Sequence, residues 1–107
     1  MVSTAVISDD ETMAAMTTVL NTFQYTVDPH GAVGYAALEQ YLSEWNEKGF
    51  FLETAHPLKF PETVEAITGT KLPVPESIQA LMNQPRKTVK MPVSSEALKS
   101  FLLSTIA

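Results

Sequence analysis

Two histidines and two carboxylates are the side chains whose types suggest chemistry in this sequence. His30 follows the dipeptide Asp28-Pro29, and His56 lies three positions after Glu53. An imidazole can bind a metal ion or transfer a proton near neutral pH. Because the chain has two histidines and no cysteine, a metal site would need Asp28 or Glu53 to complete it. Nothing in the spacing of Asp28 and Glu53 brings the two carboxylates together. A histidine in a proline-containing turn most often has a structural hydrogen-bonding role, and this is the commoner expectation for both histidines.

A second candidate site lies where an apolar run ends. Residues 50–52, Phe-Phe-Leu, have the composition of a short buried strand between a glycine and a proline-marked turn. Polar residues just beyond such a strand lie where open α/β sheets bind ligands, which places Thr54 and His56 at a candidate site. Lys59 could form a Schiff base with a carbonyl cofactor if it were desolvated or next to another cation. Since Phe-Pro follows Lys59 at a helix start, a solvated or ion-paired lysine is the simpler interpretation.

Three short strands and about five helices are predicted to position these residues. The expected strands are at about residues 4–7, 50–54 and 88–91, where β-branched and aromatic residues gather. The order of strands and helices predicts an α/β fold with a small three-stranded sheet. So small a sheet offers little surface for several helices. We therefore expect residues 1–107 to be a single domain that belongs to something larger.

Local capping signals set the ends of the first three predicted helices. Ser8 and Glu11 have the spacing of a capping box, so a helix begins there. A second helix is predicted over about residues 31–48, with Trp45 on its apolar face as a core anchor. A third runs over Pro61–Gly69, with proline at the first helical position and glycine as a stop.

Two further helices are predicted in the last third of the chain. Pro75 can open a short one, and Ser94 is a good N-cap for the last. Val93 before that cap and Leu98 inside the helix have the positions of a hydrophobic staple.

Composition and charge narrow the class of protein. The chain has 107 residues, of which 45% are apolar and 18% charged, so it is expected to fold as one domain. The formal net charge is −5, and the seven basic residues form no run. Nucleic-acid binding, which needs a basic face, is therefore not expected.

The same composition bears on the compartment. The absence of cysteine fits a reducing environment. No apolar run approaches the ~20 residues of a membrane span. Residues 1–4 carry no basic segment, so no signal peptide is apparent. We expect a cytoplasmic protein with no membrane association.

Two stretches together resemble the C-terminal portion of the threonine synthase family. Residues 25–37 read Tyr-Thr-Val-Asp-Pro-His-Gly-Ala-Val-Gly-Tyr-Ala-Ala, and residues 52–67 have Glu-Thr-Ala-His-Pro-Leu-Lys-Phe at their centre. The family carries Asp-Pro-His-x-Ala-x-Gly and then Thr-Ala-His-Pro-x-Lys-Phe, of which the second is a specific signature. The tail from residue 72 to residue 101 is also similar to the family's ending, so the resemblance covers essentially the whole chain.

The resemblance implies the C-terminal part of a fold-type II enzyme that depends on pyridoxal phosphate, of the tryptophan-synthase-β-like fold. This family is a carbon–oxygen lyase of threonine biosynthesis, converting O-phosphohomoserine and water to threonine and phosphate. Thr54 would correspond to the hydroxyl residue that hydrogen-bonds the pyridine nitrogen of the cofactor. Asp28 and His30 match a segment bordering the cofactor cleft, while His56 and Lys59 would line it or brace the loop. No catalytic residue and no metal ligand is assigned.

The departures from the family pattern predict what this chain lacks. The lysine that holds the cofactor and the glycine-rich cup for its phosphate lie upstream of the matched region, and Lys59 occupies the signature's own lysine position. We expect a fragment of a longer enzyme that neither binds the cofactor tightly nor catalyses alone. Its partner would be the rest of the chain, and apolar surface exposed at the cut would favour homo-oligomers. The alternatives are a non-catalytic interaction domain that kept the fold and a small His-dependent hydrolase or metal enzyme.

Overall fold

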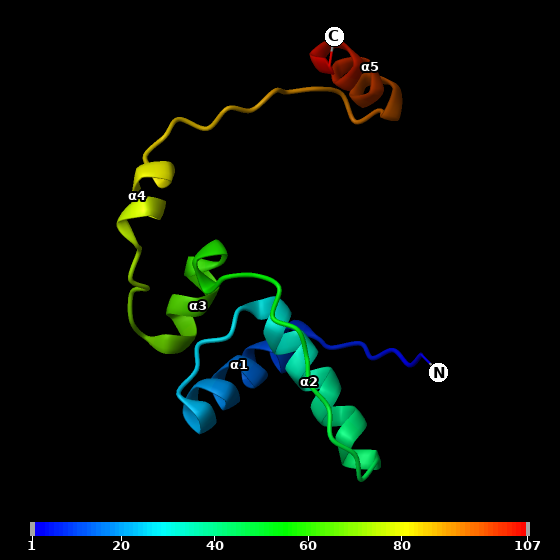
Figure 1. The fold of residues 1–107 in the computed structure, drawn as a ribbon, viewed down its shortest axis with the longest axis vertical. Coiled ribbons are helices and arrows are strands. Elements are labelled where there is room, and N and C mark those ends of the chain that lie inside the picture. The colour runs from blue at the N-terminus through cyan, green and yellow to red at the C-terminus, as the bar shows by residue number, and fades with distance from the viewer. Residues whose placement is uncertain (1, 107) are drawn as a thin grey trace. The chain divides into compact units, whose positions relative to one another are not determined.

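The computed structural model describes residues 2–106 as helices joined by extended segments (Figure 1). The elements in chain order are α1 (Asp9–Phe23), α2 (Pro29–Glu44), the 3-10 turn η1 (Pro57–Lys59), α3 (Pro61–Thr68), α4 (Glu76–Met82) and α5 (Ser95–Ile106). The chain divides into two compact units, one ending at Val74 and the other beginning at Pro75.

The predicted α/β fold is wrong, because no residue from 2 to 106 is part of a strand. The three segments expected as strands, at residues 4–7, 50–54 and 88–91, lie outside the helices without strand pairing. A strand exists through the hydrogen bonds of a ladder, and β-branched composition alone does not supply the partner. Each of the three segments has strongly exposed hydrophobic side chains, among them Val6 at 93%, Phe50 at 85% and Val89 at 61%. The fold is helical.

The predicted capping box at the start of α1 is confirmed. The Glu11 N–H donates to Ser8 Oγ at 3.3 Å, and the Ser8 N–H donates to Glu11 Oε2 at 2.8 Å. The backbone and side-chain hydrogen bonds from Ser8 lower the pKa of the Glu11 carboxyl. On its inner face α1 buries Ala15, Met16 and Val19, which make up half of the core cluster.

Replacing Ser8 is expected to weaken α1. Ser8→Ala removes the acceptor for the Glu11 N–H, so the helical circular-dichroism signal and the thermal midpoint should both fall, whereas Ser8→Asp should keep both. Because the Glu11 pKa is lowered in the folded chain, the stability it contributes is present above its unfolded pKa. That contribution is lost as the pH falls through the folded value. Equal melting of the two variants at neutral pH would contradict a capping role.

Helix α2 begins two residues earlier than predicted and ends earlier as well. Asp28 is its N-cap and Pro29 its first residue, a position where the missing N–H of proline costs nothing. The prediction that Trp45 anchors the core is wrong. Trp45 is the C-cap, has an extended backbone and is 54% exposed, with its indole stacked on Tyr41 at 6.2 Å between ring centroids.

After α2 the chain runs back along that helix towards η1 (Figure 1). Burial alternates along this stretch: Phe51, Glu53 and Ala55 are partly buried, while their neighbours Leu52 and Thr54 are exposed. Such alternation is typical of extended backbone with one side against a surface. This segment therefore resembles a strand in conformation, although it has no ladder.

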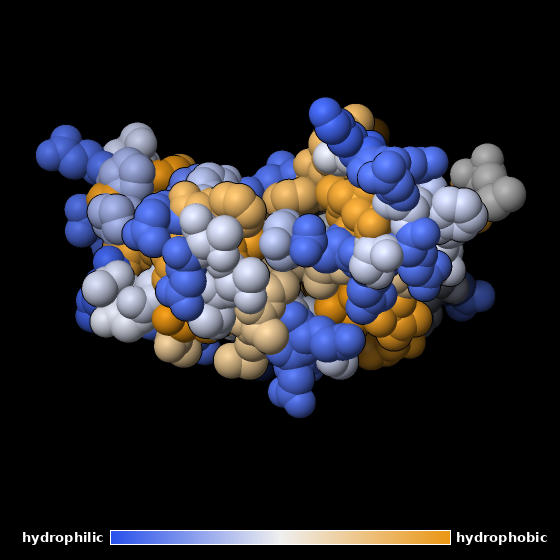
Figure 2. Space-filling model, turned by 90° about the horizontal axis from the view of Figure 1, so that it is seen from below, coloured by the Kyte–Doolittle hydropathy of each residue, from blue (hydrophilic) through white to orange (hydrophobic). Residues whose placement is uncertain are grey.

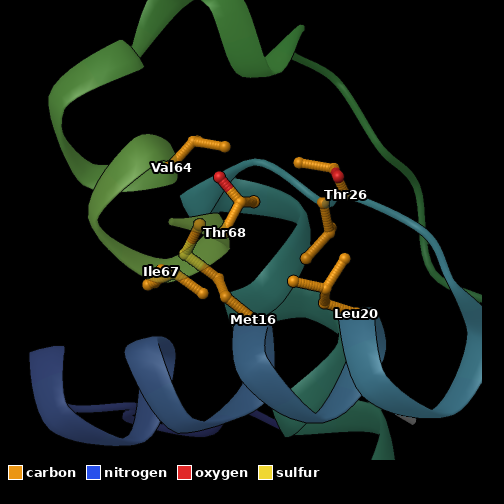
Figure 3. A pocket seen from close by; sticks show the side chains of 7 residues that line it. Met16, Leu20, Thr26, Val64, Ile67 and Thr68 are labelled. Carbon is orange, nitrogen blue, oxygen red and sulfur yellow. The ribbon is translucent and has the colours of Figure 1, made fainter. Parts of the chain in front are cut away.

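The bounds of α3 confirm the third predicted helix. It starts at Pro61 and is closed by Gly69, which has φ 68° and lies in the left-handed region. Val64 of this helix is fully buried in the core. Met16 and Leu20 of α1 and Ile67 and Thr68 of α3 point towards one another around a small hollow (Figure 3). The hollow has no room for a water molecule, so it is a packing defect and not a ligand site.

The second unit contains α4 and α5, and neither helix contains a buried residue. The predicted cap of the last helix is confirmed, because the Ala97 N–H donates to Ser94 Oγ at 3.3 Å. The predicted staple is wrong, since Val93 is completely exposed. Figure 2 shows hydrophobic side chains at the surface in several places. The exposed hydrophobic side chains of the second unit include Leu81, Met82, Leu98, Leu102, Leu103 and Ile106.

Candidate functional site

The carboxylate of Asp28 organises the start of α2. Its side chain is fully buried and accepts hydrogen bonds from the Gly31 N–H at 2.9 Å and the His30 N–H at 3.1 Å. The Nδ1 atom of His30 lies 3.0 Å from the same carboxylate. The local sequence explains this geometry. Pro29 keeps Asp28 out of the α region, and an N-cap residue needs the extended backbone that results.

The carboxylate of Glu53 reaches the same helix end from a distant part of the chain. Its Oε1 accepts the Asp28 N–H at 3.2 Å, and its Oε2 accepts the Tyr25 hydroxyl at 2.6 Å. Two carboxylates thus lie at the positive end of the α2 dipole, which favours negative charge. We call these four side chains, from Tyr25, Asp28, His30 and Glu53, the α2 entry network.

The hydrogen bond to Glu53 changes the ionisation of Tyr25. That bond, followed by desolvation and by the charges of Glu53 and Asp28, raises the pKa of the Tyr25 phenol. The cause is physical: the bond needs the hydroxyl hydrogen, and ionisation would set a phenolate against a carboxylate. The network therefore favours the protonated phenol.

Glu53→Gln is expected to return the Tyr25 titration towards its ordinary value of about 10. The phenol is then no longer held by a charged acceptor. Because the pKa is raised in the folded chain, the stability that Tyr25 contributes is present below its unfolded pKa and is lost as the pH rises through the folded value. The difference in alkaline absorbance between each chain and its Tyr25→Phe partner isolates this phenol. An unchanged titration in Glu53→Gln would contradict the hydrogen bond.

His30 presents one ring nitrogen outwards. Because a carboxylate only accepts, the Nδ1 beside Asp28 carries a hydrogen, and Nε2 takes no part in that contact. The His30 side chain is 62% exposed, and its ring lies 5.0 Å from the Phe60 ring between centroids. This arrangement orients an imidazole on the surface by means of a buried carboxylate.

The other predicted site residues follow the extended segment. His56 caps η1 through Nδ1, which accepts the Leu58 N–H at 3.1 Å. Lys59 ends η1 and is exposed, as is Thr54. The structure thus joins Asp28 to His30, leaves Thr54 exposed next to the partly buried Glu53, and gives His56 a local capping role.

Sequence reasoning missed the link between Glu53 and the start of α2. Spacing alone kept Asp28 and Glu53 apart, yet the structure brings the Glu53 carboxylate to the Asp28 backbone across 25 positions. The available signal was the N-cap itself, since the N–H of a capping residue requires its own acceptor.

No group of three or more His, Cys, Asp or Glu side chains among residues 2–106 is placed to hold a metal ion. None of the helices described for this chain has the length and apolar character needed to cross a membrane.

Comparison with known proteins places the chain in a family. The family model for the threonine synthase C-terminal region matches residues 31–102. Threonine synthase of Serratia marcescens is 40% identical over 99 residues, a match covering 92% of this chain and 23% of that protein. The Escherichia coli (strain K12) threonine synthase is 38% identical over 96 residues, covering 90% and 22% respectively.

A solved structure agrees with the sequence matches. The crystal structure of threonine synthase from Escherichia coli superposes with a TM-score of 0.80 at 37% identity, over 94% of this chain and 23% of that chain. The matched proteins are threonine synthases, and this chain belongs to the threonine synthase C-terminal family. The resemblance inferred from the sequence is therefore confirmed. The chain spans less than a quarter of the length of these relatives.

Proposed function

We propose that this chain is the C-terminal part of a cytoplasmic threonine synthase, which uses pyridoxal phosphate to convert O-phosphohomoserine and water to threonine and phosphate. The observation that carries the proposal is the family match over residues 31–102, together with relatives of which this chain covers 22–23%. The exposed apolar side chains of α4 and α5 support it, because helices with no buried residue need another surface to pack on. The rest of the enzyme would provide that surface.

The residues of this chain suit the pyridine nitrogen of the cofactor but not its phosphate group. A helix N-terminus often binds phosphate, but the start of α2 is already filled by the carboxylates of Asp28 and Glu53. A phosphate group there would meet two negative charges. Thr54, by contrast, offers an exposed hydroxyl on extended backbone. We therefore assign to this chain the partner of the pyridine nitrogen, and to the rest of the enzyme the phosphate cup and the lysine.

Each proposed side chain has a definite task. When bound, the cofactor supplies an electron-withdrawing ring that stabilises negative charge on the substrate. The Thr54 hydroxyl would hold the ring nitrogen without giving it a full proton. His30, oriented by Asp28, and the exposed ammonium of Lys59 would face the cleft. His56 would brace the loop by capping η1. Alone, the chain would not catalyse, because the lysine that holds the cofactor lies elsewhere.

A chimera tests the proposal. The matching C-terminal region of the Escherichia coli enzyme is replaced by this chain, and binding of pyridoxal phosphate and release of phosphate from O-phosphohomoserine are measured. The chimera should bind the cofactor and form threonine. The Escherichia coli enzyme truncated at the same point, and this chain alone, should do neither. A folded chimera that does not bind the cofactor would contradict the proposal, and so would turnover by the chain alone.

A further inference from the structure

We propose that Glu53 is the positioning residue for Thr54, holding its hydroxyl towards the cofactor through the α2 entry network. This inference rests on the proposed function of Thr54. The two residues are neighbours on extended backbone, where successive side chains point to opposite sides. Glu53 is partly buried against α2, and Thr54 is exposed on the other side. A fixed orientation of Glu53 therefore fixes the direction of Thr54.

Glu53 is held from two directions. The Tyr25 hydroxyl donates to one carboxylate oxygen at 2.6 Å and the Asp28 N–H donates to the other at 3.2 Å, so the carboxylate cannot rotate without losing a bond. Packing adds to this restraint. A Cβ built on Gly31 would lie 3.4 Å from the Glu53 carboxyl carbon, which shows how closely α2 approaches it.

The hydrogen bonds of Glu53 take the place of the backbone ladder that residues 50–54 lack. An ordinary strand is kept in register by backbone hydrogen bonds to its neighbours. Residues 50–54 have no such pairing, so the side chain of Glu53 provides the long-range hydrogen bonds that tie this segment to α2. A hydroxyl that must meet a cofactor atom needs placement to within about 0.5 Å. The network supplies that placement one residue away from the hydroxyl.

The chimera carrying Glu53→Ala tests this role by its affinity for pyridoxal phosphate and the absorption spectrum of the bound cofactor. Glu53→Ala should weaken affinity about tenfold, the lower end of what losing an outer-shell partner costs a bound metal, and should shift the spectrum in the same direction as Thr54→Val does. Glu53→Gln keeps an oxygen acceptor for the Asp28 N–H and should stay close to the unsubstituted chimera. Glu39→Gln, the same change on the exposed face of α2, should have no effect.

A double substitution separates positioning from a general structural role. If Glu53 acts through Thr54, then Glu53→Ala should change affinity little once Thr54 is valine. An equal loss in both backgrounds would overturn the proposal, as would Glu53→Ala behaving like the unsubstituted chimera. Tyr25→Phe removes one of the two hydrogen bonds to the Glu53 carboxylate, at an exposed position. It should give a smaller spectral shift in the same direction, which keeps the test valid if Glu53→Ala does not fold. No spectral change in Thr54→Val would instead overturn the proposed function itself.

Discussion

Gly31→Ala is expected to lower the free energy of unfolding of the first unit, unlike the same change at Gly34, the other glycine of α2. A Cβ at this position would lie 2.6 Å from Val27 Cγ2 and 3.2 Å from Asp28 Oδ1. Val27 is 1% exposed and belongs to the core cluster. Either Val27 or the start of α2 would have to shift, and overpacking of this kind costs about 1–3 kcal/mol. The shift would also loosen the hydrogen bonds of the α2 entry network.

Gly34→Ala is the matched control for this prediction. A Cβ there would meet Phe51 Cβ at 3.5 Å, which is ordinary contact, and alanine favours a helix interior by about 1 kcal/mol over glycine. Urea unfolding of the two variants should therefore move in opposite directions. If Gly31→Ala were as stable as Gly34→Ala, the close packing of α2 against Val27 would be wrong.

Asp28→Ala is expected to cost about 2 kcal/mol, of the same order as the Gly31 change. The substitution removes the N-cap of α2 and leaves the buried Gly31 N–H without its acceptor. It also releases His30, whose Nδ1 loses the carboxylate that orients it. Urea unfolding measures the first effect. The nitrogen chemical shifts of the His30 ring report the second, since the hydrogen is no longer confined to Nδ1.

Two control variants show whether the loss of stability in Asp28→Ala comes from the buried N-cap. Asp28→Asn keeps one oxygen acceptor for the Gly31 N–H and should lose less stability than alanine. Asp10→Ala removes an exposed carboxylate from the first turn of α1 and should change stability only slightly. A loss for Asp28→Ala no larger than for Asp10→Ala would contradict the buried cap.

Local signals in the sequence predicted the helices well. The pairing of Ser8 with Glu11, the proline and glycine at the ends of α3, and the Ser94 cap each depend on residues within one turn, so their effects could be deduced without knowing the fold. The link between Asp28 and His30 is local in the same sense, because it spans two positions.

Features that depend on distant partners were not predictable in this way. Residues 50–54 have the composition of a strand, but a strand needs a neighbour, and the described chain offers none. Trp45 was expected in the core because large aromatic side chains are usually buried, yet it is 54% exposed. The Glu53 bonds to Tyr25 and Asp28 cross 28 and 25 positions, and no periodicity encodes them.

The most direct test of the central claim is the rate of phosphate release by chimeras that differ only at Thr54. Thr54→Ser keeps the hydroxyl and should retain activity close to that of the unsubstituted chimera. Thr54→Val keeps the shape but not the hydrogen bond, and should slow release about tenfold or more, the effect of losing one buried hydrogen bond of about 1.5 kcal/mol. Equal rates for serine and valine would contradict the assignment of Thr54 as the partner of the cofactor nitrogen.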